Sequence, residues 1–311
     1  MNETKYKKAQ TKRQALLIES GSECYYGAKN RGLASWEKEG RLYQRESRTV
    51  LKDRDREKNL YQPIRRDVIE YMKEKQISWW HMVKEMDNEV TAHVLSSQVH
   101  CINHLFAIRN DAEAIKAILK TAIGIEFDEI LPSFIDDGCL ISFEFVFENR
   151  SLLNEKHETR GQKCTSIDAL IYAQKGEEKW LVPLEWKYTE SYDHIKDEYY
   201  YSRYIAMPSK NSRLSSWHEL YKKEPFYELG RQTLLMEKII EKHPEIASRF
   251  FHLVVIPVGN EEMRKDAKEF QDSLTTDGRN NFKIVSSEDL LSPIAEKYSE
   301  LCEYLRTRYW E

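Results

Sequence analysis

Residues 164–188 read CTSIDALIYAQKGEEKWLVPLEWKY, and the predicted fold centres on them. Two segments rich in β-branched and apolar residues, 164–173 and 180–188, lie on either side of the turn signal Lys175-Gly176-Glu177. This pattern predicts two strands that form a hairpin or lie as near neighbours. Because Pro183 has no backbone N–H, we expect a bulge or a locally unpaired amide where it stands in the second strand.

The elements on either side of this pair alternate in type. Apolar residues at spacings of three and four predict a long helix from Ser96 or Ser97 to Ile123, with Gly124 as its C-cap. Residues 141–148, ISFEFVFE, have the period of two that is typical of a strand. Downstream, a helix over 225–242, a buried strand over 250–257 and a C-terminal helix opened by Ser292-Pro293 are expected. The order predicts a mixed α/β (α+β) fold with an αβββαβ core.

Charge and composition suggest how the chain is divided. Residues 1–60 carry 15 Lys and Arg against 9 Asp and Glu, without a sustained apolar period. We expect a charged, mostly helical N-terminal extension over residues 1–90, with short helices near 64–75 and 79–85, and one domain over 91–311. A polar, aromatic stretch at about 189–224 is expected to be an insertion. The basic extension fits either a solvated surface or a contact with nucleic acid, and both interpretations stay open.

The whole-chain composition is that of a globular protein. The 311 residues include 48 Lys and Arg and 52 Asp and Glu, and 41% are hydrophobic. No apolar run approaches the ~20 residues of a membrane span, so no membrane association is expected. Five scattered cysteines without metal-ligand spacing predict reduced thiols, a cytoplasmic location and no structural zinc. The net charge of −4 excludes a uniformly basic coat but not a local positive groove beside an acidic site.

Acidic residues and a lysine fall on three consecutive predicted strands. Glu185 and Lys187 are two residues apart, so their side chains share one face, and a hairpin would bring Asp168 close to Glu185. Glu144 lies on the polar side of the preceding strand. Close carboxylates repel one another unless a cation neutralises them, and hard oxygen ligands suit Mg²⁺ or Mn²⁺. With a lysine to offset charge on a phosphate, the set predicts metal-dependent phosphodiester hydrolysis.

Ser166-Ile167-Asp168 and Glu185-Trp186-Lys187 resemble the motif of the PD-(D/E)xK nuclease superfamily, which has the restriction-endonuclease-like fold. Residues 77–81, 96–103, 165–168 and 185–190 are similar to an uncharacterised family of bacterial restriction-endonuclease-like proteins, and the resemblance covers roughly residues 60–260. It implies that Asp168 and Glu185 bind the metal, with the Trp186 carbonyl as a further ligand, and that Lys187 is the catalytic lysine. The departure is Ile167, which replaces the proline of the motif.

Several other residues have two interpretations each. Gln232 and Arg231 could face the site or solvent, and Gln98 and Asn103 could support the site or serve as surface and capping residues. Glu144 could be an additional acidic ligand or the polar face of its strand. The tyrosines of the 189–224 insertion could stack on nucleic acid, cover a core edge or form a dimer surface. His100 and His104 are one helical turn apart, but no third ligand is near to make a zinc site.

The sequence therefore favours a Mg²⁺- or Mn²⁺-dependent nuclease that acts on nucleic acid, most simply DNA, in defence or repair. Two other classes are weighed against it. A binding or scaffolding protein could keep the fold without cutting, and a glycosidase could use Glu144 and Glu185 as acid and base, although it would leave Lys187 without a role. A homodimer is open by analogy with enzymes that cut both strands of a duplex.

Overall fold

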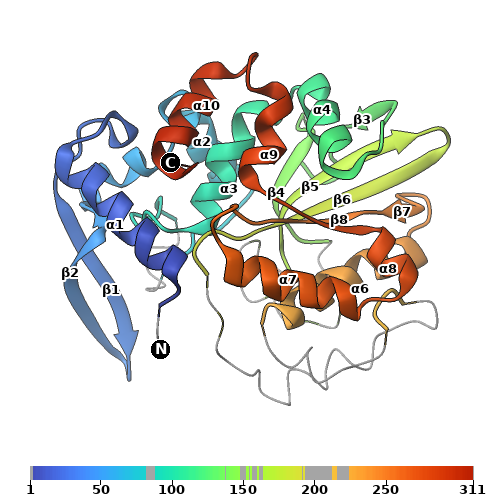
Figure 1. Cartoon of the computed structure of the whole chain (residues 1–311), viewed down its shortest axis with the longest axis horizontal. Coiled ribbons are helices and arrows are strands. Elements are labelled where there is room, and N and C mark those ends of the chain that lie inside the picture. Colours follow the sequence, from blue (N-terminus) through green and yellow to red (C-terminus); the bar gives the residue numbers. More distant parts are fainter. Residues whose placement is uncertain are drawn as a thin grey trace.

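The computed structural model describes residues 3–81, 88–136, 138–147, 152–153, 155, 160, 164–190, 192, 212–215 and 224–310. Within these residues a seven-stranded mixed sheet runs through the centre of the molecule, with helices on both faces (Figure 1). A separate two-stranded sheet stands at one side, next to the first helix. The expected mixed α/β class and the order of the αβββαβ core are confirmed.

The central sheet is built around the predicted hairpin. Its strands are β3 (Glu129–Leu131), β4 (Ile141–Phe145), β5 (Ile167–Lys175), β6 (Glu178–Trp186), β7 (Arg249–Phe250), β8 (His252–Val255) and β9 (Phe282–Val285). β3 and β4 both pair with β5, β5 is antiparallel to β6, and β6, β8 and β9 are parallel. The parallel ladder along β6 is interrupted beside Pro183, between the pairs Leu181–Phe250 and Leu184–Leu253. The gap in the parallel ladder thus lies where Pro183 predicted an irregularity.

Two apolar clusters cover the two faces of this sheet. α3 (Ser97–Leu105), α4 (Ala112–Ile123), α9 (Ser287–Leu291) and α10 (Ser299–Leu305) lie on one face, and α6 (Phe226–Lys242), α7 (Glu261–Ser273) and α8 (Thr276–Asn280) lie on the other (Figure 1). Alternate residues of β5 join different clusters: Ala169 and Ile171 pack with the first group, Leu170 and Tyr172 with the second. Burial on both faces is what makes β5 and β8 nearly continuous apolar runs.

The N-terminal part packs against the first of these clusters. It contains α1 (Lys5–Ser20), η1 (Glu23–Tyr25), β1 (Arg31–Lys38), β2 (Arg41–Leu51), η2 (Asp53–Asn59), η3 (Gln62–Ile64) and α2 (Arg65–Glu74). Ile18, Tyr25, Leu51 and Leu60 are fully buried in the same core as the sheet residues. The described residues of this part are thus packed into the core, and residues 31–51 form a hairpin of strands within the extension that was expected to be mostly helical. The boundary at residue 90 stays a prediction.

Several boundaries differ from the sequence expectations. The helix expected from residue 97 to 123 is two helices, because the chain turns through η5 (Phe106–Ile108) and Asp111 then caps α4. Ser96 and Gly124 cap the two outer ends as predicted. The C-terminal helix begins as a short η7 (Ser292–Ile294) and ends in η8 (Arg306–Trp310), and α7, α8, α9 and β9 were not predicted. Most of the helix expected at 79–85 lies outside the described residues.

No helix in the described part of the chain is both long enough and apolar enough to cross a lipid bilayer.

Candidate active site

Three acidic residues lie side by side across the strands β4, β5 and β6. Phe143 pairs with Ala169 and Ala169 pairs with Leu184, so Glu144, Asp168 and Glu185 occupy neighbouring positions one step further along each strand. Residues opposite one another in an antiparallel pair point to the same side. The register places Asp168 and Glu185 on the α6 side of the sheet at the end of the β5–β6 pairing, and Glu144 lies beside them where β4 leaves the ladder.

Asp168 and Glu185 form the centre of the site. The backbone N–H of Trp186 donates to Asp168 Oδ2 over 2.6 Å. Burial, followed by the negative charges of Glu185 and Glu144, raises the pKa of Asp168 well above its usual range. Glu185 is 2% exposed, and burial followed by the charge of Glu228 raises its pKa to about 7. The two acids thus resist carrying negative charge together unless a cation compensates it.

Lys187 is held between two carboxylates. Its Nζ lies 2.5 Å from Glu185 Oε1, makes a second ion pair with Glu228, and donates to the Tyr192 hydroxyl over 3.1 Å. Burial alone would lower the pKa of Lys187, but the charges of Glu185 and Glu228 outweigh it and raise the pKa well above its usual range. Lys187 is therefore a fixed cation in this site, buried to 4% exposure.

Glu144 belongs to the site and not to a solvated strand face. It is 8% exposed, and its carboxylate accepts hydrogen bonds from Gln98 Nε2 over 2.9 Å and from Ser166 Oγ over 3.0 Å. Burial raises its pKa. Its backbone has φ of 48°, a left-handed conformation that costs a non-glycine residue roughly 1–2 kcal/mol.

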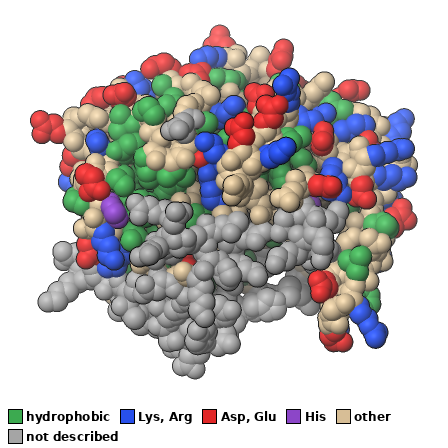
Figure 2. Space-filling view, turned by 180° about the vertical axis from the view of Figure 1, so that it is seen from behind, with side chains coloured by type: hydrophobic (Ala, Val, Ile, Leu, Met, Phe, Trp, Pro, Cys, Tyr) green, Lys and Arg blue, Asp and Glu red, His purple; other side chains and the backbone are tan. Residues whose placement is uncertain are grey.

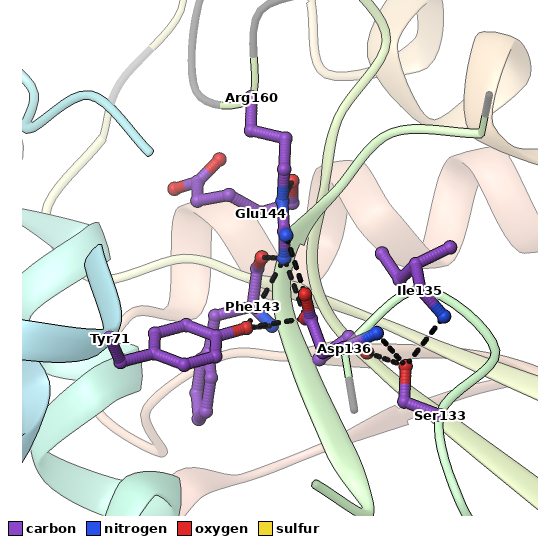
Figure 3. Close-up of polar contacts among 8 residues, drawn as sticks. Tyr71, Ser133, Ile135, Asp136, Phe143, Glu144 and Arg160 are labelled. Carbon is purple, nitrogen blue, oxygen red and sulfur yellow. Dashed lines mark hydrogen bonds and ion pairs between the residues drawn. The ribbon is translucent and has the colours of Figure 1, made fainter. Parts of the chain in front are cut away.

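A buried ion pair holds this kink in place (Figure 3). Arg160 donates to the carbonyls of both Phe143 and Glu144, the two residues at the kink. Its guanidinium also binds both carboxylate oxygens of Asp136, over 2.7 and 2.8 Å, and Asp136 accepts the Tyr71 hydroxyl over 2.6 Å. The strain at Glu144 is thus offset by hydrogen bonds from the network of Tyr71, Asp136 and Arg160. The side chains of Glu144, Asp168 and Glu185 do not take part in these bonds.

The acids face a pocket. One part, about 440 Å³, is lined by Asp168, Glu185, Lys187, Glu228 and Lys7, and also by Trp80 and His93. An adjoining part of about 210 Å³ is lined by Glu144, Gln98 and Arg231 and shares Asp168 and Glu185 with the first. Glu144, Asp168, Glu185 and Glu228 therefore border two adjoining volumes that share lining residues.

The structure separates the supporting residues that the sequence left open. Gln232 is in the site, since its Nε2 donates to Glu185 and, over 3.2 Å, to the Ser166 carbonyl. Gln98 is also in the site, because it joins Glu144 to the backbone of Ser78 and Trp80.

Other candidates lie elsewhere. Asn103 is a core residue bonded to Tyr61 N and to the Tyr309 hydroxyl. His100 and His104 are buried against the opposite face of the sheet, where Trp186 Nε1 donates to His100. Arg231 lines the smaller part of the pocket and pairs with Glu155. The insertion's remaining tyrosines, Tyr199, Tyr200, Tyr201, Tyr204 and Tyr221, and Trp217 lie outside the described residues.

Glu228 is the site residue that sequence reasoning missed. It lies in the first turn of α6, four residues before Gln232, so both side chains project from the same face of the helix. That spacing is the signal that could have found it. α6 thus contributes one acid, Glu228, and one amide, Gln232, to the site, beside the three acids that come from the strands.

The donor set fits a hard divalent cation. Burial and neighbouring negative charges raise the pKa of Asp168 and of Glu185, and only one oxygen of Asp168 is hydrogen-bonded within the described residues. Gln232 Oε1 is buried there without a partner. In the same part of the chain, no group of three or more His, Cys, Asp or Glu is arranged to hold a metal ion. Asp168 and Glu185 would therefore need a backbone carbonyl and water to complete a coordination shell.

The order of the sheet and its helices is compatible with the restriction-endonuclease-like class of proteins, and the acids and the lysine lie together on that scaffold. The chain belongs to the family described as Restriction Endonuclease associating with ARP, which matches residues 6–310. The match covers the N-terminal elements and η8 as well as the central sheet. No curated protein and no solved structure matches the chain. The family name indicates a nuclease-like function and a nucleic-acid substrate.

Proposed function

We propose that this protein is a divalent-metal-dependent nuclease of the PD-(D/E)xK type that hydrolyses phosphodiester bonds in DNA. The observation that carries the proposal is the placement of Asp168, Glu185 and Lys187 in one pocket, on strands adjoining in register. The family to which the chain belongs supports it. We place the activity in the cytoplasm, in defence against foreign DNA or in repair.

Each residue has a distinct part in the proposed reaction. Asp168 and Glu185, with the Trp186 carbonyl, would hold Mg²⁺ or Mn²⁺, which supplies Lewis-acid activation of water and phosphate when bound. Lys187 offsets the charge that grows on the phosphate, because the flanking carboxylates keep it protonated. Glu144 and Gln98 hold the neighbouring wall of the pocket, and Gln232 orients Glu185.

The test is digestion of supercoiled plasmid DNA in Mg²⁺ or Mn²⁺ by wild type, Asp168→Asn and Lys187→Met. Matched controls are Asp272→Asn and Lys268→Met, which remove the same charges from an exposed ion pair on α7. We expect cleavage by the wild type and the controls and loss of cleavage in the two site variants. Equal activity in all five proteins would refute the assignment.

A second candidate function is a nucleic-acid-binding or scaffolding protein that does not cut. It is favoured by Glu185, both of whose carboxylate oxygens already accept protein donors, from Lys187 and Gln232. Calorimetric titration with Mg²⁺ and with Mn²⁺ separates the two. Binding at millimolar concentration that is lost in Asp168→Asn supports the nuclease, whereas no heat of binding in the wild type supports the scaffold.

A further inference from the structure

The β1–β2 hairpin projects from the body of the molecule beside α1 (Figure 1). Its two-residue turn, Glu39-Gly40, has φ of 54° and 70°, the pair of positive values found in tight hairpins whose twist matches the strands. The pairing is regular from Gly32 opposite Ser47 to Lys38 opposite Arg41. Side chains along this hairpin therefore alternate strictly between two faces.

Charge is segregated between these two faces. Lys38 and Arg41, Trp36 and Tyr43, and Ala34 and Arg45 are opposite pairs on one side, which we call the basic face. The other side carries the pairs Leu33 and Glu46, Ser35 and Gln44, and Glu37 and Leu42. Over residues 33–46 the strands thus place three cations and no acid on the basic face, and two acids and no cation on the other.

No residue that the structure describes neutralises the cations of the basic face. Lys38, Arg41 and Arg45 are exposed, and none of them forms an ion pair with any residue that the structure describes. At the base of the hairpin the opposite holds, since Arg31 and Arg48 both pair with Glu19. In Figure 2, Lys and Arg side chains gather on the upper part of the edge that carries this region, above the projecting end.

An aromatic pair lies between these cations. Trp36 and Tyr43 stack with ring centres 5.9 Å apart and planes inclined by 15°, and Tyr43 remains 40% exposed. Because the rings stack on each other, they stiffen the ribbon and leave less ring surface for a splayed base. Single strands usually bind in a groove with free aromatic platforms, whereas a two-stranded ribbon fits against a duplex or into its major groove.

The hairpin is anchored beside the candidate active site. Leu33, Ala34 and Ser35 line a small cavity of about 70 Å³ together with Trp80 and His93, and the last two also line the pocket of Asp168 and Glu185. From residue 34 to the turn the strand rises about 17 Å at ~3.3 Å per residue. That length corresponds to roughly five base pairs of a duplex at ~3.4 Å each.

We propose that the basic face of the hairpin, Lys38, Arg41 and Arg45 around the Trp36–Tyr43 pair, binds the phosphate backbone of duplex DNA next to the catalytic pocket. The proposal rests on the proposed nuclease function for the identity of the polyanion, but its binding step requires no cleavage. Guanidinium and ammonium groups contact phosphates without reading sequence, so the face would position DNA and not select a site.

The test measures binding of a labelled duplex by fluorescence anisotropy in EDTA, over about 50–200 mM salt. The triple variant K38Q/R41Q/R45Q is compared with wild type and with the matched variant E37Q/E46Q on the other face. Losing three phosphate contacts lowers the slope of log affinity against log salt by about 2.7 and weakens binding up to ~500-fold at 0.1 M salt. The matched variant should bind at least as tightly as wild type, and circular dichroism confirms that both variants fold.

If the triple variant keeps the wild-type slope of log affinity against log salt, the proposal is overturned. It is also overturned if the variant binds a single strand of the same length with an equal loss of affinity, because that excludes a duplex-specific contact. Its failure is distinguishable from failure of the nuclease proposal. If wild type does not cleave but the triple variant loses duplex binding, the hairpin proposal stands alone. If wild type cleaves and the triple variant binds normally, only the nuclease proposal stands.

Discussion

Asp136→Asn tests the ion pair that supports the kinked end of β4. Asp136 is fully buried, and its carboxylate accepts two hydrogen bonds from Arg160 and one from Tyr71 (Figure 3). The asparagine has nearly the same shape but no charge, so Arg160 keeps its carbonyl partners at Phe143 and Glu144 and loses its counter-ion. The perturbation therefore separates the charge of the pair from its packing.

The expected loss of stability follows from burial. Removing one partner of a buried ion pair costs roughly 3–5 kcal/mol, and the 13% exposure of the Arg160 side chain places this case at about 3 kcal/mol. For a chain of 311 residues that loss lowers the melting temperature by about 5 °C. Asp67→Asn is the control, since Asp67 pairs with Arg109 over 3.9 Å at 60% exposure and should change stability by less than about 1 kcal/mol.

The assay is urea unfolding of both variants and wild type at several pH values. Burial would raise the pKa of Asp136, but the hydrogen bonds and charge of Arg160 and the Tyr71 hydroxyl lower it overall. A depressed carboxyl pKa stabilises the fold above the unfolded value of about 3.9 and loses this contribution as the pH falls through the folded pKa. The difference between wild type and Asp136→Asn should thus be full near neutral pH and shrink below about pH 4. A difference under about 1 kcal/mol at neutral pH would contradict the reasoning.

Three further predictions concern the pocket itself. Glu228→Gln leaves Lys187 with one carboxylate and should slow cleavage by about 10- to 100-fold, with Glu228→Asp partly restoring the rate; wild-type rates in both would exclude the role given to Glu228. Gln98→Leu removes the hydrogen bonds to Glu144, Ser78 and Trp80 and should lower the free energy of urea unfolding by roughly 2–3 kcal/mol. An unchanged unfolding midpoint would contradict this role of Gln98. Mg²⁺ at about ten times its dissociation constant should stabilise wild type by roughly 1.4 kcal/mol in a thermal melt. The same addition should leave Asp168→Asn unchanged, so an equal shift in that variant would place the ion elsewhere.

The sequence predicted the parts of the fold that local patterns specify. The β5–β6 hairpin has apolar segments on both sides of a turn signal, and Ser96 and Gly124 are capping residues with a local chemistry, so these features were found. The break at Arg109–Asp111 was missed because the nine residues from Phe106 to Ile115 are a multiple of three and so fit the helical spacing, although Asp111 is itself a good N-cap. The β1–β2 hairpin was missed because its strands are mostly exposed and carry no apolar alternation.

The candidate site shows the same limit. Asp168, Glu185 and Lys187 could be placed together because the register of one hairpin relates them. Glu228 lies more than 40 residues further along the chain, and its approach to Lys187 depends on how α6 packs across the sheet. The kink at Glu144 depends on the ion pair of Arg160 with Asp136, which no local sequence pattern predicts.

The packing of α1 against η8 bears on when the protein can become active during synthesis. Gln14 donates to the Arg308 carbonyl, 294 residues away, and closing a loop of that length costs roughly 5 kcal/mol of chain entropy. Gln10 and Gln14 also hydrogen-bond the Tyr188 hydroxyl, one residue after Lys187. A ribosome that has just made Tyr188 needs about 6 to 24 s more to reach Arg308, at ~5–20 residues per second. Until then α1 lacks its contact with η8, so the helix that hydrogen-bonds the Tyr188 hydroxyl is not yet fixed in its final place.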